Sequence, residues 1–216
     1  MRQFQTDFLN FVIDHHILKF GEFTLKSGRV SPYFFNAGLF NTGEKIAFLA
    51  KSYAVAIASS GLDFDVLFGP AYKGIPLAAS TSMALATEQG INKPFCFNRK
   101  EAKDHGEGGT IVGAALIGKT LVIDDVITAG TAIREAAEIL THNGAVLCGI
   151  AVAMDRQEKG SGSKSAIQEI EDDYQVPVIS IINLENIIDF LAQASDPHFQ
   201  THISAVKKYR NEYGVS

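Results

Sequence analysis

The sequence predicts an α/β fold, in which a doubly wound and mainly parallel sheet carries a small N-terminal hood. Three observations lead to this fold class. Short apolar runs typical of buried strands recur along the chain, at 65–69, 94–98, 120–124, 146–154 and 176–182. Stretches with apolar residues at helical spacing separate these runs, which is the alternation of a parallel sheet with helical crossovers. About the first 40 residues differ, because they predict a helix and then an aromatic hairpin.

The length and composition are those of a globular protein. The 216 residues suffice for a sizeable core, and we expect a single domain over 1–216, divided into the helix and hood hairpin (about 1–40) and the core (about 41–216). A formal net charge of −5 argues against a general nucleic-acid binder. No apolar run approaches the roughly 20 residues of a membrane span, and no signal-peptide pattern opens the chain. Both cysteines stand in apolar runs, as buried thiols of cytoplasmic proteins do. We therefore expect a cytoplasmic protein with neither nucleic acid nor a membrane as a partner.

The N-terminal elements follow from periodicity and turn residues. Apolar residues on one helical face predict a first helix over about 3–16. Two β-prone aromatic runs around a Lys-Ser-Gly-Arg turn predict a hairpin within 20–38. Asn41 and Glu44 have the spacing of a capping box, which predicts the start of a helix that ends near Ser60.

The next unit is a strand, a loop and a helix. The apolar run 65–69 predicts a buried strand, and apolar spacing predicts a helix over 75–89. Between them, the loop 70–74 brings Lys73 and a glycine to the mouth of the helix, where unpaired N–H groups suit an anion. A routine connection with a solvated Lys73 explains this piece equally well.

A third strand is predicted at 94–98, and the sequence then changes character. Residues 99–109 have no apolar period and contain three glycines, with three cations and two anions over 99–105. A polar loop of this kind is either a solvated surface segment or a flap that closes over an anionic ligand and excludes water. A β-prone run at 111–117 follows it.

The stretch from Thr120 to Leu140 carries the clearest sign of chemistry. Its apolar β-branched run predicts a strand buried on both faces, and Asp124 and Asp125 follow at the carboxyl end. A turn of small residues comes next, and a helix is predicted to begin near Thr131.

The turn and the acid pair suit two different parts of one ligand. A glycine turn at a helix N-terminus can point several N–H groups at a phosphate, and Thr128 and Thr131 can add hydroxyl donors. Adjacent carboxylates accept hydrogen bonds from vicinal hydroxyls or bind Mg²⁺. A ribose 5-phosphate unit presents both faces. An ordinary capped connection would explain the turn alone, but Asp124 and Asp125 at the end of a buried strand favour a site. Neither a GxxxxGK[ST] nor a GxGxxG pattern occurs in this stretch.

The last third of the chain adds a guanidinium at a further strand end. The strand predicted at 146–154 is followed by Arg156, which could grip a carboxylate through two hydrogen bonds or simply be exposed. A flexible linker, a helix, a strand and two helices are predicted after it, at 159–165, 167–174, 176–182, 184–194 and 197–213.

Three of the predicted loops should meet. The loops 70–74, 124–132 and 155–156 all follow the carboxyl ends of predicted parallel strands. Ligands of open α/β sheets bind at that edge. We therefore expect one site there.

The stretch 120–131 resembles the motif with which type I phosphoribosyltransferases bind phosphoribosyl diphosphate (PRPP): an apolar strand, two acids and Thr-x-Gly-Thr. The resemblance implies the type I phosphoribosyltransferase fold and PRPP as a substrate. Two further runs are similar to orotate phosphoribosyltransferases of the short bacterial type. They are Leu-Lys-Ser-Gly-Arg-x-Ser-Pro-Tyr-Phe-Phe at 25–35 and Arg-Lys-x-x-Lys-x-His-Gly at 99–106. This family joins orotate to PRPP, giving orotidine 5-phosphate and diphosphate in pyrimidine (UMP) biosynthesis.

The resemblance also implies roles for individual residues. It implies that PRPP is bound by Lys26, Tyr72, Lys73, Arg99, Lys100, Lys103, His105, Asp124, Asp125, Val126, Ile127, Thr128, Ala129, Gly130, Thr131 and Ala132. It implies that orotate is bound by Lys26, Phe34, Phe35, Thr128 and Arg156. The catalytic residues that it implies are Lys103, His105, Asp124 and Asp125.

The same resemblance implies a cofactor, an assembly and a backbone feature. Mg²⁺ is expected as the cofactor, held mainly by substrate and water without a direct protein ligand. A homodimer is expected in which the loop 99–109 covers the active site of the partner subunit. Such loops in the family often carry a cis peptide between non-proline residues, and Ala71-Tyr72 is the candidate position for one here.

Two alternatives remain. A purine phosphoribosyltransferase would share the PRPP motif, but the hairpin at 25–35 and Arg156 argue against it. A non-catalytic regulator on the same fold could sense PRPP and bind nucleic acid, but the negative net charge and the complete loop 99–109 argue against it.

Overall fold

A six-stranded sheet forms the centre of the computed structural model, which describes residues 1–25, 27–103, 109–160, 162–194 and 196–215. The strand order is β5-β4-β3-β6-β7-β8. Five strands are parallel, and the edge strand β5 pairs antiparallel with β4. Their bounds are β3 (Val66–Gly69), β4 (Phe95–Lys103), β5 (Gly109–Gly113), β6 (Gly118–Ile123), β7 (Ala145–Asp155) and β8 (Val178–Asn183). The predicted α/β class with a mainly parallel sheet is confirmed.

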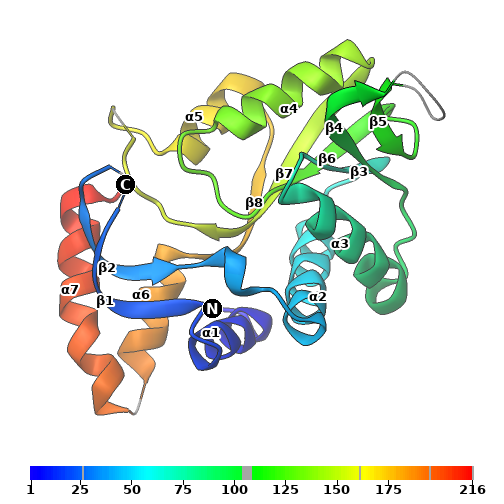
Figure 1. Cartoon of the computed structure of the whole chain (residues 1–216). Coiled ribbons are helices and arrows are strands. Elements are labelled where there is room, and N and C mark those ends of the chain that lie inside the picture. The colour runs from blue at the N-terminus through cyan, green and yellow to red at the C-terminus, as the bar shows by residue number, and fades with distance from the viewer. Residues whose placement is uncertain (26, 104–108, 161, 195, 216) are drawn as a thin grey trace.

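Helices cover both faces of this sheet (Figure 1). The central strand β6 supplies both cores, because Leu121 and Ile123 join one buried cluster while Val122 joins the other, each with no exposed surface. The first cluster includes residues of α2 (Gly43–Ser60) and α3 (Gly74–Gln89), and the second includes residues of α4 (Thr131–His142) and α5 (Ala166–Tyr174). The uninterrupted apolar run of β6 is therefore explained by burial on both sides.

The direction in which successive strands are added to the sheet reverses between β3 and β6. The chain moves from β3 outward to β4 and β5, and then returns to place β6 on the other side of β3. The loops that leave β3 and β6 therefore diverge to opposite sides and open a crevice between the carboxyl ends of these strands. Open α/β sheets bind their ligands at such a switch point.

The N-terminal segment folds over this edge of the sheet. It consists of α1 (Gln3–Asp14) and the antiparallel pair β1 (Leu18–Thr24) and β2 (Val30–Phe35), with a short 3-10 turn, η1 (Ala37–Leu39), after it. In Figure 1 it lies beside α6 (Leu184–Gln193) and α7 (Pro197–Tyr213), so both ends of the chain form one flank of the molecule. Within the described residues, no helix has the length and apolar character that a membrane span requires.

Three details of the sequence-based prediction were wrong. The cap of α2 is Thr42 rather than Asn41, since the Thr42 hydroxyl accepts the Lys45 N–H at 3.3 Å. Strand β4 continues to Lys103 instead of ending at 98, because an edge pair can carry polar side chains and so shows no apolar run. Strand β5 ends at Gly113, whose φ of +97° turns the chain well before Ile117.

Candidate active site

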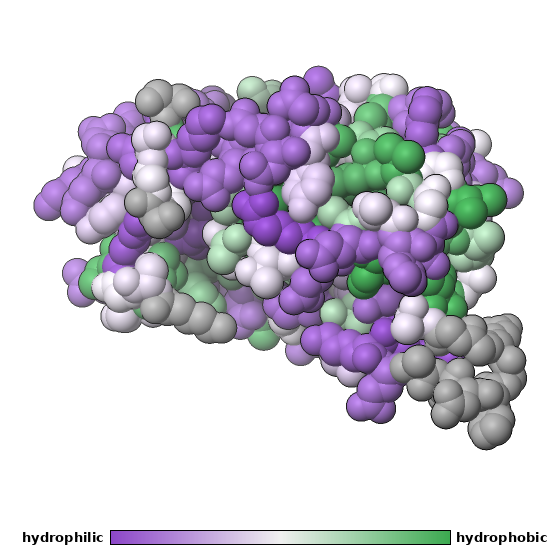
Figure 2. Space-filling view, turned by 90° about the horizontal axis from the view of Figure 1, so that it is seen from above, coloured by the Kyte–Doolittle hydropathy of each residue, from purple (hydrophilic) through white to green (hydrophobic). Residues whose placement is uncertain are grey.

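A cavity of about 1080 Å³ opens at the carboxyl edge of the sheet, beneath the hairpin. Parts of the hood and three loops that follow strands contribute to its wall, with residues 24–25, 27, 29, 34–38, 70–73, 124–128, 132 and 154–160, together with the start of α5. The predicted convergence of the loops after β3, β6 and β7 is confirmed. The surface seen in Figure 2 is largely hydrophilic.

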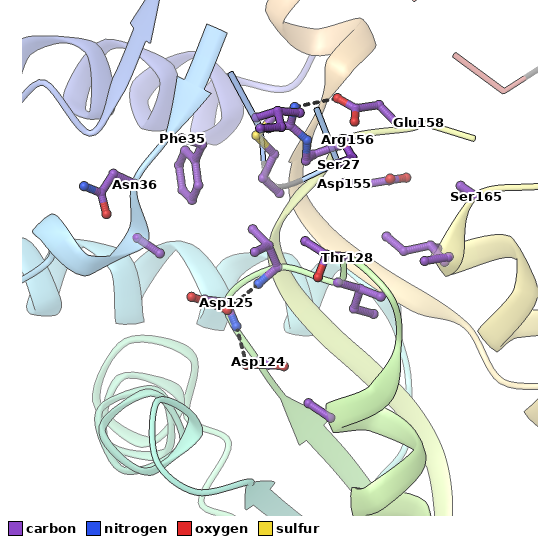
Figure 3. Close-up of a pocket in the computed structure, with 18 of the residues that line it drawn as sticks. Ser27, Phe35, Asn36, Asp124, Asp125, Thr128, Asp155, Arg156, Glu158 and Ser165 are labelled. Atoms are coloured by element: carbon purple, nitrogen blue, oxygen red, sulfur yellow. Dashed lines mark hydrogen bonds and ion pairs between the residues drawn. The ribbon is translucent and has the colours of Figure 1, made fainter. Parts of the chain in front are cut away.

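The acid pair at the end of β6 is held by a set of backbone hydrogen bonds. The Asp125 N–H donates to Asp124 Oδ1 at 2.9 Å, and the Val126 N–H donates to Asp125 Oδ1 at 2.8 Å. The buried Tyr53 hydroxyl donates to the Asp124 carbonyl at 2.8 Å, and the Ala153 N–H donates to the Asp125 carbonyl at 2.9 Å. The two carboxylates therefore have fixed positions at the cavity wall (Figure 3).

Asp124 and Asp125 have different electrostatic environments. Burial, followed by the neighbouring charge of Asp125, raises the pKa of Asp124 from 3.8 to about 6. The Lys73 ammonium lies 2.6 Å from Asp125 Oδ2, and this hydrogen bond raises the pKa of Lys73. A cation from the loop after β3 thus meets an anion from the loop after β6 across the switch point.

Two glycines, Gly69 and Gly74, lie in close contact at the two ends of the loop after β3. A Cβ on Gly69 would lie 2.1 Å from the Gly74 carbonyl oxygen, so only glycine fits there. The Ala71 N–H donates to Asn98 Oδ1 at 2.8 Å, and the Ala71-Tyr72 peptide, the candidate position, is cis. Tyr72 is 69% exposed at the cavity mouth.

Arg99 and Lys100, two of the cations predicted to bind PRPP, lie on β4 and outside the cavity wall. The Lys100 ammonium lies 5.4 Å from the centre of the Tyr72 ring. Arg99 precedes it on the same strand and does not line the cavity. Lys26 and His105 lie outside the described residues, as does the side chain of Lys103.

Only part of the turn that follows Asp124 and Asp125 lines the cavity. Val126, Ile127, Thr128 and Ala132 line the wall, whereas Ala129, Gly130 and Thr131 do not. Gly130 has a φ of +74° and caps α4, so the chain turns there into a helix whose first N–H groups face the switch point.

The opposite end of the cavity is aromatic and carries Arg156. Phe34 and Phe35 come from β2 and line the wall, with exposures of 39% and 8%. The Arg156 side chain is 15% exposed and forms an ion pair with Glu158 at 2.5 Å, drawn in Figure 3. Its guanidinium carbon lies 4.6 Å from the centre of the buried Tyr33 ring.

Several wall residues were missed by the sequence reasoning. They include Ser27, Arg29, Asn36, Asp155, Gln157, Glu158, Lys159, Gly160 and Ser165. Asp155 and Glu158 had a usable signal, because they flank Arg156 directly after a buried strand. The others had none, since their place depends on how the hairpin folds back and on a bridge that pairs Lys159 with Ser165.

The fold and the site define the class of protein. An acid pair and a helix N-terminus at the switch point of a doubly wound sheet agree with the family model that residues 39–181 match, the phosphoribosyl transferase domain. Orotate phosphoribosyltransferases from Vibrio vulnificus and Marinobacter nauticus are 60% and 61% identical over 215 residues, with 100% of both chains covered in each comparison. The crystal structure of the orotate phosphoribosyltransferase from Francisella tularensis has a TM-score of 0.88 at 46% identity, covering 96% of this chain and 99% of that one. The chain therefore belongs to the orotate phosphoribosyltransferases, a branch of the phosphoribosyltransferase family.

Proposed function

We propose that the protein transfers the ribose 5-phosphate group of PRPP to orotate, giving orotidine 5-phosphate and diphosphate in the synthesis of UMP. The observation that carries the proposal is one cavity with two chemically distinct ends. One end has the acid pair and Lys73, and the other has Arg156 beside Phe34 and Phe35. Full-length relatives at about 60% identity bear the name of this activity.

PRPP occupies the end of the cavity at the switch point. Its 5-phosphate lies in the turn 126–132, where the first N–H groups of α4 and the Thr128 and Thr131 hydroxyls can donate. Asp124 and Asp125 accept hydrogen bonds from the ribose hydroxyls. The diphosphate meets Tyr72 and Lys73, and the cations of β4 and the following loop: Arg99, Lys100, Lys103 and His105.

When PRPP binds, the contact between Lys73 and Asp125 is exchanged. The free protein satisfies both charges by their mutual hydrogen bond of 2.6 Å. The ligand offers an anion to Lys73 and hydroxyl donors to Asp125, so each partner receives a replacement. This exchange limits the net cost of opening the pair.

Orotate occupies the hood end. Its planar ring lies against Phe34 and Phe35, with Lys26 and Thr128 as polar contacts, and its carboxylate meets Arg156. This orientation directs the ring nitrogen next to the carboxylate-bearing carbon toward the anomeric carbon of PRPP.

The reaction is a displacement at the anomeric carbon. The orotate nitrogen gives up its proton, its electron pair forms the new C–N bond, and the electrons of the breaking C–O bond leave with the diphosphate. The proton from the nitrogen ends on the departing diphosphate or in solvent. The transition state has oxocarbenium character, so catalysis consists mainly of positioning and of stabilising charge. Lys103 and His105 supply a proton or cation to the departing diphosphate, and Lys73 and Lys100 assist them.

Mg²⁺ fits this site as an ion carried by the substrate. The Val126 N–H occupies Asp125 Oδ1, and Asp125 Oδ2 exchanges Lys73 for a ribose hydroxyl when PRPP binds. The described residues include no group of three or more His, Cys, Asp or Glu side chains able to hold a metal. Asp124 and Asp125 would therefore meet the ion through waters or through the ribose oxygens. When bound, Mg²⁺ neutralises part of the diphosphate charge.

We further propose a cytoplasmic homodimer in which the loop 99–109 of one subunit serves the site of the other. The free cysteines, one buried and one half-buried, suit a reducing compartment. Mixing the inactive variants Asp125→Asn and Lys103→Ala tests the sharing. Hybrid dimers would contain one intact site and recover activity, whereas no recovery would place each loop over its own subunit.

The activity is tested by a single spectrophotometric assay. Purified protein is mixed with PRPP, Mg²⁺ and orotate, and the loss of orotate absorbance is followed. Adenine and hypoxanthine serve as parallel substrates. Turnover of orotate alone supports the proposal, while turnover of a purine base in its place would overturn it. PRPP binding without turnover of any base, together with affinity for RNA or DNA, would favour a regulator.

A further inference from the structure

Glu158 lies at the hood end of the cavity, where the mechanism above gives it no role. It lines the cavity wall, and its side chain is only 13% exposed. Its Oε1 atom accepts two hydrogen bonds, from Arg156 Nη2 at 2.5 Å and from the Tyr33 hydroxyl at 3.1 Å. A buried carboxylate oxygen thus joins the guanidinium to the hood strand β2.

These contacts fix the plane of the Arg156 guanidinium. Its central carbon lies over the Tyr33 ring at 4.6 Å from the ring centre, and Nη2 also donates to Ser31 Oγ at 3.4 Å. Tyr33 is itself immobilised, since it has no exposed surface and packs edge-on against the Tyr209 ring. Within the described residues, both hydrogen bonds that the guanidinium donates come from Nη2, so the two N–H groups of Nη1 stay available to a ligand in the cavity.

The backbone that carries Glu158 is also clamped. Residue 158 forms a β-bridge with Gly214. The Lys159 N–H donates to the Tyr213 carbonyl at 2.8 Å, and the Val215 N–H donates to the Gln157 carbonyl at 2.9 Å. A short antiparallel pairing with the segment 213–215 therefore sets the position from which the Glu158 carboxylate reaches Arg156.

We propose that Glu158 is a positioning residue for the recognition of the base: it holds Nη2 of Arg156 so that the Nη1 group of the guanidinium meets the orotate carboxylate. The inference rests on the proposed function. Arginine loses many rotamers when it is fixed, and a preformed contact removes that cost before the ligand arrives. The Tyr33 hydroxyl stabilises the Glu158 charge, so two carboxylates can share one guanidinium with its five N–H donors.

Competition between Glu158 and orotate for Arg156 would have the opposite effect on orotate binding, and the test distinguishes it from positioning. If Glu158 merely competed with orotate for Arg156, removing its charge would tighten orotate binding. Positioning predicts weaker binding of orotate, with PRPP unaffected. The two possibilities therefore differ in the sign of one measured constant.

The experiment compares steady-state constants of Glu158→Ala and Glu158→Gln with the unsubstituted protein. For Glu158→Ala, we expect the KM for orotate to rise about tenfold, because a charge-assisted hydrogen bond is lost. The KM for PRPP and kcat should change less than twofold. Glu158→Gln keeps an acceptor oxygen and should recover part of the loss. If Glu158→Ala does not fold, Glu158→Gln decides alone, with an orotate KM raised about threefold expected.

A double variant separates positioning from a general structural effect. In the background of Arg156→Ala, replacing Glu158 should not raise the KM for orotate further, since it acts through Arg156. Glu185→Ala is the matched control, because Glu185 pairs with Arg210 at 3.2 Å on the neighbouring helices and does not line this cavity. Its constants should not change.

The outcomes keep the two proposals apart. No orotate turnover by the unsubstituted protein would refute the proposed function. With normal turnover, an unchanged or lowered KM for orotate in the Glu158 variants would refute positioning. An equal rise in the KM values for orotate and PRPP, or a further loss in the Arg156→Ala background, would refute it as well.

Discussion

Lowering the pH should switch off PRPP recognition through one carboxyl group. Burial and the charge of Asp125 raise the pKa of Asp124 from 3.8 to about 6. Below that value Asp124 holds a proton in the free protein and can no longer accept hydrogen bonds from two ribose hydroxyls. The dependence on pH should therefore appear in kcat/KM for PRPP, which reports the free enzyme.

The size of the effect follows from the shift. At pH 5, one unit below a pKa of about 6, roughly one tenth of Asp124 is ionised, so kcat/KM should fall about tenfold. The shift of about two units corresponds to roughly 3 kcal/mol. Because the pKa in the folded state lies above the unfolded value, this energy opposes folding once Asp124 is ionised. The cost grows as the pH rises from about 4 to 6 and is complete above that window.

The assay uses Asp124→Asn as the reference. The variant should have a lower kcat/KM for PRPP but should lack the acid limb near pH 6, whereas ionisations of the ligand affect both proteins alike. At pH 8 its thermal unfolding should occur at a higher temperature than that of the unsubstituted protein. An acid limb of equal size in both proteins, or a less stable variant at pH 8, would refute the reasoning.

Four further changes have distinct expected outcomes. Lys103→Ala should lower kcat far more than it weakens PRPP binding, measured by single-turnover kinetics and calorimetry; an unchanged kcat would remove Lys103 from the mechanism. Arg156→Ala should raise the Kd of orotate much more than that of PRPP, and equal losses would mean that the carboxylate binds elsewhere. Gly69→Ala should raise the KM for PRPP and lower Tm, because its Cβ would meet a backbone oxygen at 2.1 Å; normal values of both would show that the loop can move aside. Tyr33→Phe removes a buried hydrogen bond to a carboxylate and should cost about 1.5–3 kcal/mol, or roughly 4–10 °C in Tm, and a Tm within 1 °C or so of the parent would argue against that bond.

The part of the site that follows buried strands could be predicted from the sequence. The apolar run before Asp124 and Asp125 could only be a strand covered on both faces, and the carboxyl ends of parallel strands share one edge. The loop with Lys73 and the strand end with Arg156 were located by the same argument. These inferences needed only local pattern and the geometry of a parallel sheet.

The part of the site that depends on tertiary contacts could not be predicted in the same way. Glu158 faces Arg156 because the segment 213–215 pairs with the residues around it, more than fifty positions along the chain. The extension of β4 to Lys103 was missed for a different reason, since polar residues in an edge pair leave no hydrophobic signature. Thr42 was passed over as a cap because Asn41 has an equally good capping side chain and stands one position away.

The two ends of the cavity are built from different segments of the chain, and this matters for engineering. The end proposed for PRPP follows the strands of the sheet, whereas the end proposed for the base is built from β2, the 156–160 segment and the segment 213–215 that pairs with it. Redesign for another pyrimidine acid should therefore centre on the second set of segments and on Thr128 of the turn before α4. The acid pair, which is assigned to PRPP alone, should stay unaltered in such exchanges.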